Sequence, residues 1–330
     1  MITEREHEIE LFKPEEFWTL SINFQDKNKS KITASISQLD GEKIEKFSFK
    51  NKEEIEKAIS NIKTKKFNIT DISSKVVSRN PSGPFTTSTL QQVASSRLGF
   101  GASRTMQIAQ KLYQGIEIEG DTVGLITYMR TDGTNLSADA VTDFRNFIKK
   151  EYGNEYLPEN PNNYSGKKAK NAQEAHEAIR PTDINRNPDS IKKYLSSDQQ
   201  KLYSLIWSRA LSSQMETAKF DRNTITIESE DGKTICKSSG SVLKFDGFLK
   251  VYSNQSKDDD EQILPEMSKG PINIEALIDE QHFTQPPPRY SEASLVKKLE
   301  ELGIGRPSTY ASIISTIANR GYAEIVNKRF

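Results

Sequence analysis

The chain has 330 residues, which is long for a single domain and suits two or three. Hydrophobic residues make up 34% and charged residues 28%, a polar composition that still provides enough Leu, Ile, Val and Phe to bury cores. The 46 basic side chains balance 46 acidic ones, which argues against a simple basic protein that coats DNA but leaves room for a basic groove on one face.

The first quarter of the chain changes from helix to strand. Residues 1–12 have the pattern of a helix end, so we expect further chain upstream of Met1. A helix is predicted over residues 51–63, with Asn51 as its N-cap. Alternating apolar and β-branched residues predict strands over residues 17–24, 31–39, 45–50 and 67–80.

Prolines and a glycine in residues 80–84 mark a boundary, beyond which the pattern becomes helical. Ser88 and Gln91 fit a capping box, and Ser137 is predicted to cap a later helix. Residues 122–129 predict an apolar strand. Helices are expected over residues 88–98, 101–113, 137–153, 173–180 and 197–215.

Strands resume at Thr217, and three prolines at 286–288 start a final helical unit. There, residues 291–303 and 308–321 predict two helices joined by a glycine-containing turn, which resembles a helix-turn-helix. Residues 322–330 are expected to add a wing-like strand.

These patterns predict an α+β protein of several domains. A strand-rich domain is expected from two chain segments, 13–79 and 215–285, with a helical domain, 80–214, inserted between them. Residues 286–330 are expected to form part of another helical domain, to which 1–12 would also belong.

The densest polar cluster is ITYMRTDGTNLS, residues 126–137. If Tyr128 ends a strand, then Arg130, two residues on, shares its face. A phenol needs a nearby cation to attack phosphorus, and an arginine can also grip a phosphate through two hydrogen bonds. The alternative is a tyrosine buried in a sheet, with Arg130 and Asp132 as a surface pair.

A second cluster is QEAHEAIRP, residues 173–181. On a helix, His176 and Arg180 would be neighbours one turn apart and could meet one phosphate together. The alternative is a partly exposed helical histidine flanked by glutamates.

The third cluster is GIGRPSTYASII, residues 303–314. Ser308 is predicted to cap a helix whose first amides, with Arg306, could hold a phosphate. The alternative is ordinary capping chemistry in a helical hairpin.

Several signals are absent. The single cysteine, Cys236, excludes a disulfide framework and a cysteine-rich zinc site, and fits a reducing cytoplasm. No apolar run approaches the roughly 20 residues that span a bilayer. There is no Walker motif, so ATP hydrolysis is unsupported. Asp258, Asp259 and Asp260 are interpreted as a solvated acidic loop, and no metal site is expected on this chain.

Seven segments, in order along nearly the whole chain, resemble the type IA DNA topoisomerases, and within them the bacterial topoisomerase I branch. ITYMRTD and GIGRPSTYA are the most specific of these segments. Met129 stands where proline is common in the topoisomerase III branch, and reverse gyrase shares the same core. GIGRPSTYA lies within the longer segment FTQPPPRYSEASLVKKLEELGIGRPSTYASIISTI, and the others are KPEEFW, PFTTSTLQQVASSRLGFG, QEAHEAIRPTD, KFDGF and RGYAEI.

The resemblance implies a strand-rich arch, a helical gate domain and a DNA-binding domain. Tyr128 would form a 5′-phosphotyrosine link with single-stranded DNA, and Arg130 would hold the scissile phosphate. His176 would lie near the cleavage site. The implied DNA contacts are Arg180, Arg306, Ser308, Thr309 and, less directly, Asp132.

The resemblance also implies parts that these residues lack. Family members begin with an Mg²⁺-binding Toprim domain and often end in zinc ribbons, so Mg²⁺ is expected through the absent domain. The partner would be single-stranded or underwound DNA, without any membrane, and the protein would be a monomer in the bacterial cytoplasm, associated with the nucleoid. The alternatives are a non-catalytic DNA-binding module, part of a topoisomerase III or reverse gyrase, or an interaction scaffold.

Overall fold

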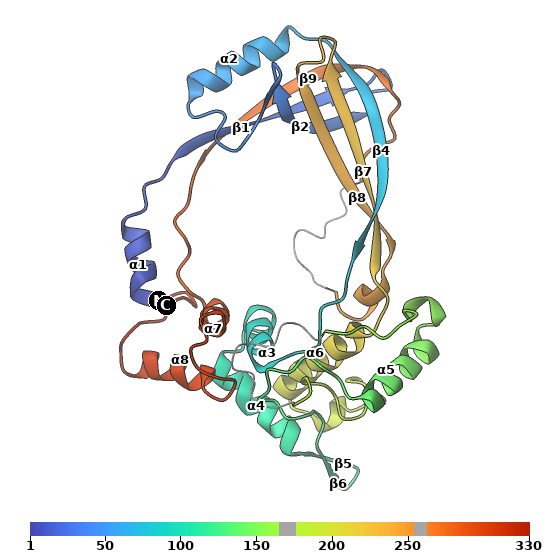
Figure 1. The fold of residues 1–330 in the computed structure, drawn as a ribbon, viewed down its shortest axis with the longest axis vertical. Helices are drawn as coiled ribbons and strands as arrows, with labels where there is room; N and C mark the ends of the chain where they lie inside the picture. The colour runs from blue at the N-terminus through green and yellow to red at the C-terminus, as the bar shows by residue number, and fades with distance from the viewer. Residues whose placement is uncertain (165–175, 254–262) are drawn as a thin grey trace.

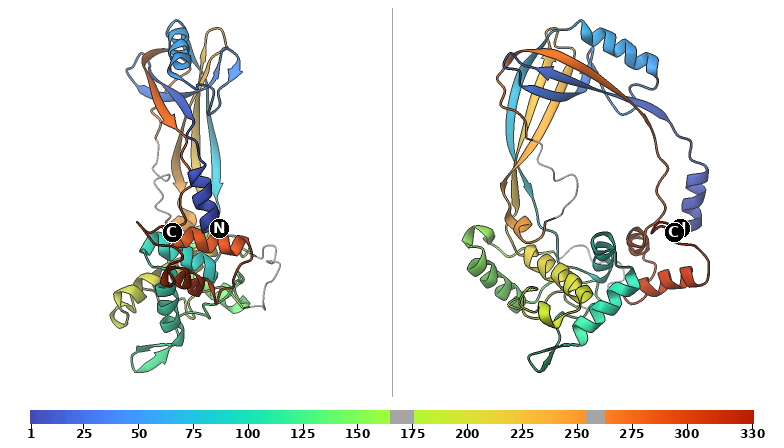
Figure 2. Two further views of the ribbon diagram at one scale, coloured as in Figure 1. Left: turned by 90° about the vertical axis from the view of Figure 1, so that its left-hand side faces the viewer. Right: turned by 180° about the vertical axis from the view of Figure 1, so that it is seen from behind.

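The computed structural model describes residues 1–164, 176–253 and 263–330. The elements follow one another around a ring, with an antiparallel sheet on one side and a group of helices on the opposite side (Figure 1). Seen edge-on, the ring is narrow, and the two chain ends lie close together (Figure 2). None of the helices in the described part is long and apolar enough to cross a membrane.

The sheet is antiparallel and closes on itself. Within the described ranges it has seven strands, and its first strand pairs both with the last strand of the chain and with the second, which closes the order into a loop. The spatial order is β1 (Glu16–Gln25), β9 (Gly270–Phe283), β4 (Phe67–Arg79), β7 (Ala218–Ser229), β8 (Ile235–Phe245), β2 (Lys31–Leu39) and β3 (Glu42–Lys43).

The period-two pattern of the sequence explains the core of the sheet. In β1 the side chains of Leu20, Ile22 and Phe24 are buried, and their neighbours lie at or near the surface. Helix α2 (Lys52–Lys63) covers this core with an apolar face, and Asn51 caps it by accepting a hydrogen bond from the Glu54 amide. Each large aliphatic side chain buried in this way contributes about 1.5–3 kcal/mol. The predicted α2, its N-cap and the alternation of β1 are confirmed.

A second core lies among the helices of the inserted segment and includes Phe85, Leu125, Met129 and Phe144. Ser137 caps α5 as predicted. The elements around this core are α3 (Thr87–Val93), η1 (Ala94–Leu98), α4 (Ala102–Gln114), the hairpin β5 (Ile116–Ile118) and β6 (Asp121–Val123), α5 (Ala138–Glu151), η2 (Asn154–Tyr156), η3 (Lys192–Tyr194), α6 (Ser197–Ser213) and η4 (Gly247–Lys250).

The predicted capping box at Ser88 and Gln91 is wrong. The box is formed by Thr86 and Thr89, so α3 begins earlier than expected. Ser88 lies inside the helix, and its hydroxyl instead donates to Glu300 of α7.

A third core joins the two ends of the chain. Helix α1 (Ile2–Glu10) lies against the segment before α7 (Glu292–Glu301), where the Arg5 guanidinium sits 4.4 Å from the centre of the Tyr290 ring. Arg289 forms an ion pair with Glu6. Helix α8 (Tyr310–Asn319) packs on α7. Instead of the predicted wing strand, residues 321–330 form turns with isolated bridges, and Phe330 is buried in this core.

The chain crosses between the sheet and the helices at residues 80–84 and 212–216, and polar contacts hold these two crossings together. The Tyr164 hydroxyl lies 3.2 Å from the Pro81 carbonyl and 2.8 Å from the Ser213 carbonyl. Arg209 donates to the Gly83 carbonyl at 2.6 Å. The boundary expected from the prolines at this point therefore coincides with a real junction.

Cys236 provides a test of the sheet core. It is 0% exposed, and burial raises the pKa of its thiol to about 12, so the thiol stays protonated and unreactive at pH 8. We expect no reaction with a thiol reagent until the sheet unfolds. As a control, Ser239→Cys in a Cys236→Ala background places a thiol at an exposed position of the same strand and should react at once. Rapid labelling of native Cys236 would contradict this packing.

Candidate active site

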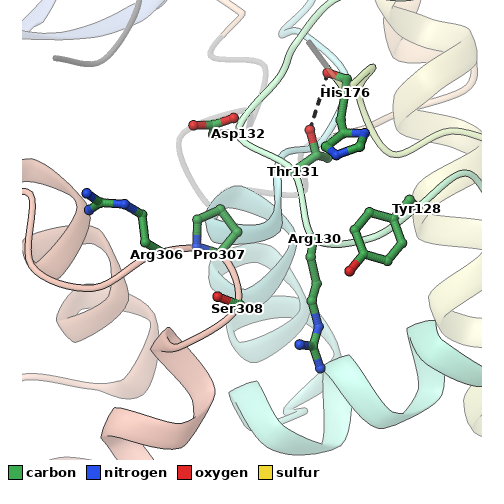
Figure 3. A pocket seen from close by; sticks show the side chains of 8 residues that line it. All are labelled: Tyr128, Arg130, Thr131, Asp132, His176, Arg306, Pro307 and Ser308. Atoms are coloured by element: carbon green, nitrogen blue, oxygen red, sulfur yellow. Dashed lines mark hydrogen bonds between the residues drawn. The ribbon is translucent and has the colours of Figure 1, made fainter. Parts of the chain in front are cut away.

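A pocket of about 500 Å³ gathers six of the eight residues singled out from the sequence. The helical core supplies one wall and the turn between α7 and α8 the other (Figure 3). Its lining is Tyr128, Arg130, Thr131, Asp132, His176, Arg306, Pro307 and Ser308.

Tyr128 and Arg130 share the open side of their segment. Both are exposed, Tyr128 to 39%, whereas Met129 between them is 1% exposed and belongs to the helical core. The tyrosine hydroxyl is directed toward the side on which Arg130 extends (Figure 3). The predicted shared face is therefore confirmed. The predicted strand is wrong, because β6 ends at Val123 and Tyr128 lies in an irregular segment with bends at Thr127, Met129 and Arg130.

Main-chain pairing with residues 178–182 holds this segment in place. The Thr127 amide donates to the Arg180 carbonyl at 3.0 Å, and the Thr127 hydroxyl donates to the Ala178 carbonyl at 2.8 Å. Ile126 forms a bridge with Pro181. The helix predicted over residues 173–180 is consequently wrong for its described part, because residues 176–180 use their backbone groups for these long-range bonds.

His176 lies beside Tyr128 despite this change. The two ring centres are 5.6 Å apart, and on another side Tyr113 of α4 meets Tyr128 edge-on at 5.4 Å. The His176 carbonyl accepts a hydrogen bond from Thr131 at 3.4 Å. The His176 imidazole can therefore reach a group bound at the Tyr128 phenol. The hydrogen bond from Thr131 holds the backbone of His176 in place.

Arg180 does not line the pocket. Its guanidinium forms two hydrogen bonds with the Glu177 carboxylate, at 2.8 and 2.9 Å, and another with the Pro181 carbonyl. The expected helical pairing with His176 is absent, since the local backbone is extended. A phosphate contact by Arg180 requires an exchange of partner.

The turn before α8 brings Arg306 and Ser308 to the pocket, with both side chains exposed. The prediction of Ser308 as N-cap is wrong, because α8 begins at Tyr310 and Thr309 occupies the cap position. The Thr309 hydroxyl accepts a hydrogen bond from the Arg306 amide at 2.8 Å, which shapes the turn from behind and keeps Thr309 out of the pocket lining.

Comparison with known proteins identifies the family. A family model described as DNA topoisomerase matches residues 1–330. The chain belongs to the DNA topoisomerase family.

The relatives with high sequence identity belong to the bacterial topoisomerase I branch of the family. The chain is 49% identical over 334 residues to DNA topoisomerase 1 of Rickettsia felis, an alignment that covers 100% of this chain and 43% of that protein. DNA topoisomerase 1 of Haemophilus influenzae is 44% identical, with 100% of this chain and 36% of that protein covered. Full-length topoisomerase I from Thermotoga maritima has a similar structure, with a TM-score of 0.79 and 36% identity over 99% of this chain and 51% of that one. The resemblance to bacterial topoisomerase I is confirmed, and the chain spans less than half of the two sequence relatives.

This topoisomerase chain offers no evident metal site in its described part, where no group of three or more His, Cys, Asp or Glu side chains could hold an ion. Asp132 is the acidic side chain among the residues that line the pocket. The loop residues Asp258, Asp259 and Asp260 lie outside the described residues. The groups that line the pocket therefore suit binding of an anion by cationic and hydroxyl side chains.

Sequence reasoning missed the ring of Tyr113 and the lining by Pro307. Tyr113 is in α4, and nothing in its local sequence connects it with Tyr128. Pro307 lies in the turn before α8, and its place in the pocket depends on packing between two separate cores.

Gly133 provides a test of the site geometry. A Cβ built at this position collides with the carbonyl oxygen of His176, which is backbone and cannot turn away. We expect Gly133→Ala to displace His176 and to lower the melting temperature measured by circular dichroism. Gly99→Ala, with a φ of +67° but open space around it, is the control and should cost only about 1 kcal/mol. Equal stability of the two variants would contradict the close approach.

Proposed function

We propose that this chain is the cleaving and rejoining core of a type IA topoisomerase that relaxes negatively supercoiled DNA without ATP. One observation carries the proposal: an exposed phenol, Tyr128, shares a pocket with the guanidinium groups of Arg130 and Arg306 and with the imidazole of His176. The family and the high identity to proteins named DNA topoisomerase 1 support it.

The chemistry is an exchange of one phosphoester for another. The Tyr128 oxygen attacks the phosphorus of a single-strand phosphodiester, a new P–O bond forms to tyrosine, and the P–O3′ bond breaks. The phenol loses its proton, and the departing 3′ oxygen gains one, so the products are a 5′-phosphotyrosine and a 3′-hydroxyl. Rejoining reverses each step.

Two cationic or titratable groups beside the phenol suit this reaction. Arg130 would hold the scissile phosphate through two hydrogen bonds. His176 would orient the phosphate or carry a proton between the reacting oxygens. On the opposite wall, Arg306 and Ser308 would contact the backbone of the bound strand, with Thr309 shaping their turn.

The energy source is the DNA itself. Because the bonds broken and formed are of the same kind, the cleaved and intact states are close in energy and no nucleotide is needed. Torsional strain in underwound DNA would drive net relaxation, and underwinding also exposes the single strand that the pocket would bind through its backbone and bases.

The ring shape of the protein suggests how a DNA strand would pass through it. We propose that the three cores correspond to an arch (residues 13–79 and 215–285), a gate (80–214) and a DNA-binding unit (286–330 with 1–12). The gate would swing about the two crossings at 80–84 and 212–216, where few chain segments join it to the arch. The protein would act as a monomer in the bacterial cytoplasm, on DNA of the nucleoid.

Mg²⁺ is expected to act through a Toprim domain, as in the relatives' family. The acidic groups of that domain would hold the ion, and the roles proposed above for Arg130, His176, Arg306 and Ser308 do not include binding it.

The nucleophile can be tested by covalent capture of single-stranded DNA under denaturing conditions, using the complete gene product. Tyr128→Phe should abolish the covalent adduct, because it removes the attacking oxygen and keeps the ring. Tyr113→Phe is the matched control, since this neighbouring tyrosine is exposed to a similar extent, 40%, and should keep the adduct. An adduct in the Tyr128 variant would identify a different nucleophile.

The 330 residues alone are expected to bind single-stranded DNA but not to relax supercoiled plasmid, because the acidic groups that activate the phosphate are expected in the Toprim domain. Binding should weaken steeply with salt, as phosphate contacts do. Mg²⁺-dependent relaxation by the 330 residues would contradict this expectation. If deletion of residues 286–330 removed all binding, and no adduct formed in the complete protein, the chain would instead be a DNA-binding module.

A further inference from the structure

The first residue of helix α3, Thr87, touches the segment that carries the proposed nucleophile. It is 0% exposed, and it is not among the residues that line the pocket. Its hydroxyl lies 2.7 Å from the Met129 carbonyl and 3.0 Å from the Thr131 carbonyl, and it accepts a hydrogen bond from the Thr131 amide at 2.8 Å. The Thr87 amide donates to the same Thr131 carbonyl at 2.9 Å.

We propose that Thr87 is a positioning residue for DNA cleavage, which it serves by fixing the peptide groups on both sides of Arg130. This inference rests on the proposed function. Thr87 does not reach the pocket, so it would touch neither DNA nor the reacting atoms.

The hydrogen-bond pattern explains why a hydroxyl is required. A hydroxyl has one proton and two acceptor sites, so Thr87 can donate to the Met129 carbonyl and accept from the Thr131 amide at the same time. These two groups flank Arg130 in the chain, and together they set the direction in which its side chain leaves the backbone. The carbonyl of Thr131 keeps its bond to the Thr87 amide even when the hydroxyl is removed.

Thr131 extends this support to the rest of the site. Its side chain accepts a hydrogen bond from the Gly133 amide at 2.9 Å and donates to the His176 carbonyl. Thr87 therefore fixes Arg130 directly and His176 through one intermediate residue. A valine at position 87 would keep the shape and the packing but would lose both hydroxyl bonds.

The contacts of Thr87 also lie within one core. The next residue, Ser88, reaches across to Glu300 of α7, so its bond would break when the proposed gate swings. The Thr87 bonds would persist through that motion. Arg130 and His176 would thus keep their places beside Tyr128 in both positions of the gate, which rejoining of the same DNA strand requires.

The test compares Thr87→Val, Thr87→Ser and Thr105→Val in the complete gene product. Thr105 is the matched control, because it is also 0% exposed and its hydroxyl donates to the Gly101 and Phe100 carbonyls near the start of its own helix. Three quantities are measured: the rate of covalent adduct formation, noncovalent binding of single-stranded DNA to the same variants, and hydrogen exchange of the Thr131 amide.

Thr87→Val should slow adduct formation about 100-fold, since small errors in placing a catalytic group cost this much, with DNA binding unchanged. Thr87→Ser and Thr105→Val should stay close to the wild type. The Thr131 amide should exchange faster in Thr87→Val than in the wild type. If the valine variant does not fold, Thr87→Ala removes the same hydroxyl and takes its place.

Wild-type rates in a folded Thr87→Val variant would overturn the inference. So would an equal loss in Thr105→Val, or a serine variant as slow as the valine variant, because either result indicates general structural damage. If the wild type itself forms no adduct, the proposed function fails; the exchange of the Thr131 amide then still decides whether Thr87 fixes this segment.

Discussion

The geometry of the site depends on one alternation along residues 127–131. Met129 points into the helical core and is 1% exposed, whereas Tyr128 and Arg130 point outward into the pocket. Burial of a methionine side chain contributes about 1.5–3 kcal/mol, so a shift by one residue would cost that energy and would also bury a guanidinium without a partner. Apolar packing on one side of the segment therefore determines which side chains face the pocket on the other.

The pocket belongs to two cores, and polar contacts hold the boundary between them. Beside the Ser88–Glu300 bond, the Ala102 amide donates to Glu292 at 2.6 Å, so a carboxylate of the terminal unit caps α4 of the helical unit. Hydrogen bonds to a charged acceptor such as a carboxylate contribute about 1.5–3 kcal/mol each. Ala102 of α4 is also buried in the apolar core formed by α7 and α8, so this boundary combines hydrogen bonds with apolar packing.

The closed sheet forms a unit of its own. Its strands pair around a loop, and its core of buried Ile and Phe side chains is separate from that of the helices. Long antiparallel strands β4, β7 and β8 run from this core toward the helical unit (Figure 1). The closed sheet therefore has an apolar core and a hydrogen-bonded frame of its own, and the junction around Tyr164 and Arg209 connects it with the helices.

The sequence alone determined the elements and the chemistry-bearing residues wherever the signal is local. Period-two burial in β1, the Asn51 cap and the exposed pair of Tyr128 and Arg130 follow from neighbours a few residues apart. Tertiary structure decided the rest, because the competing backbone bonds come from distant segments: pairing with Thr127 made residues 176–180 extended instead of helical. That extended backbone brings His176 to the phenol and leaves Arg180 paired with Glu177.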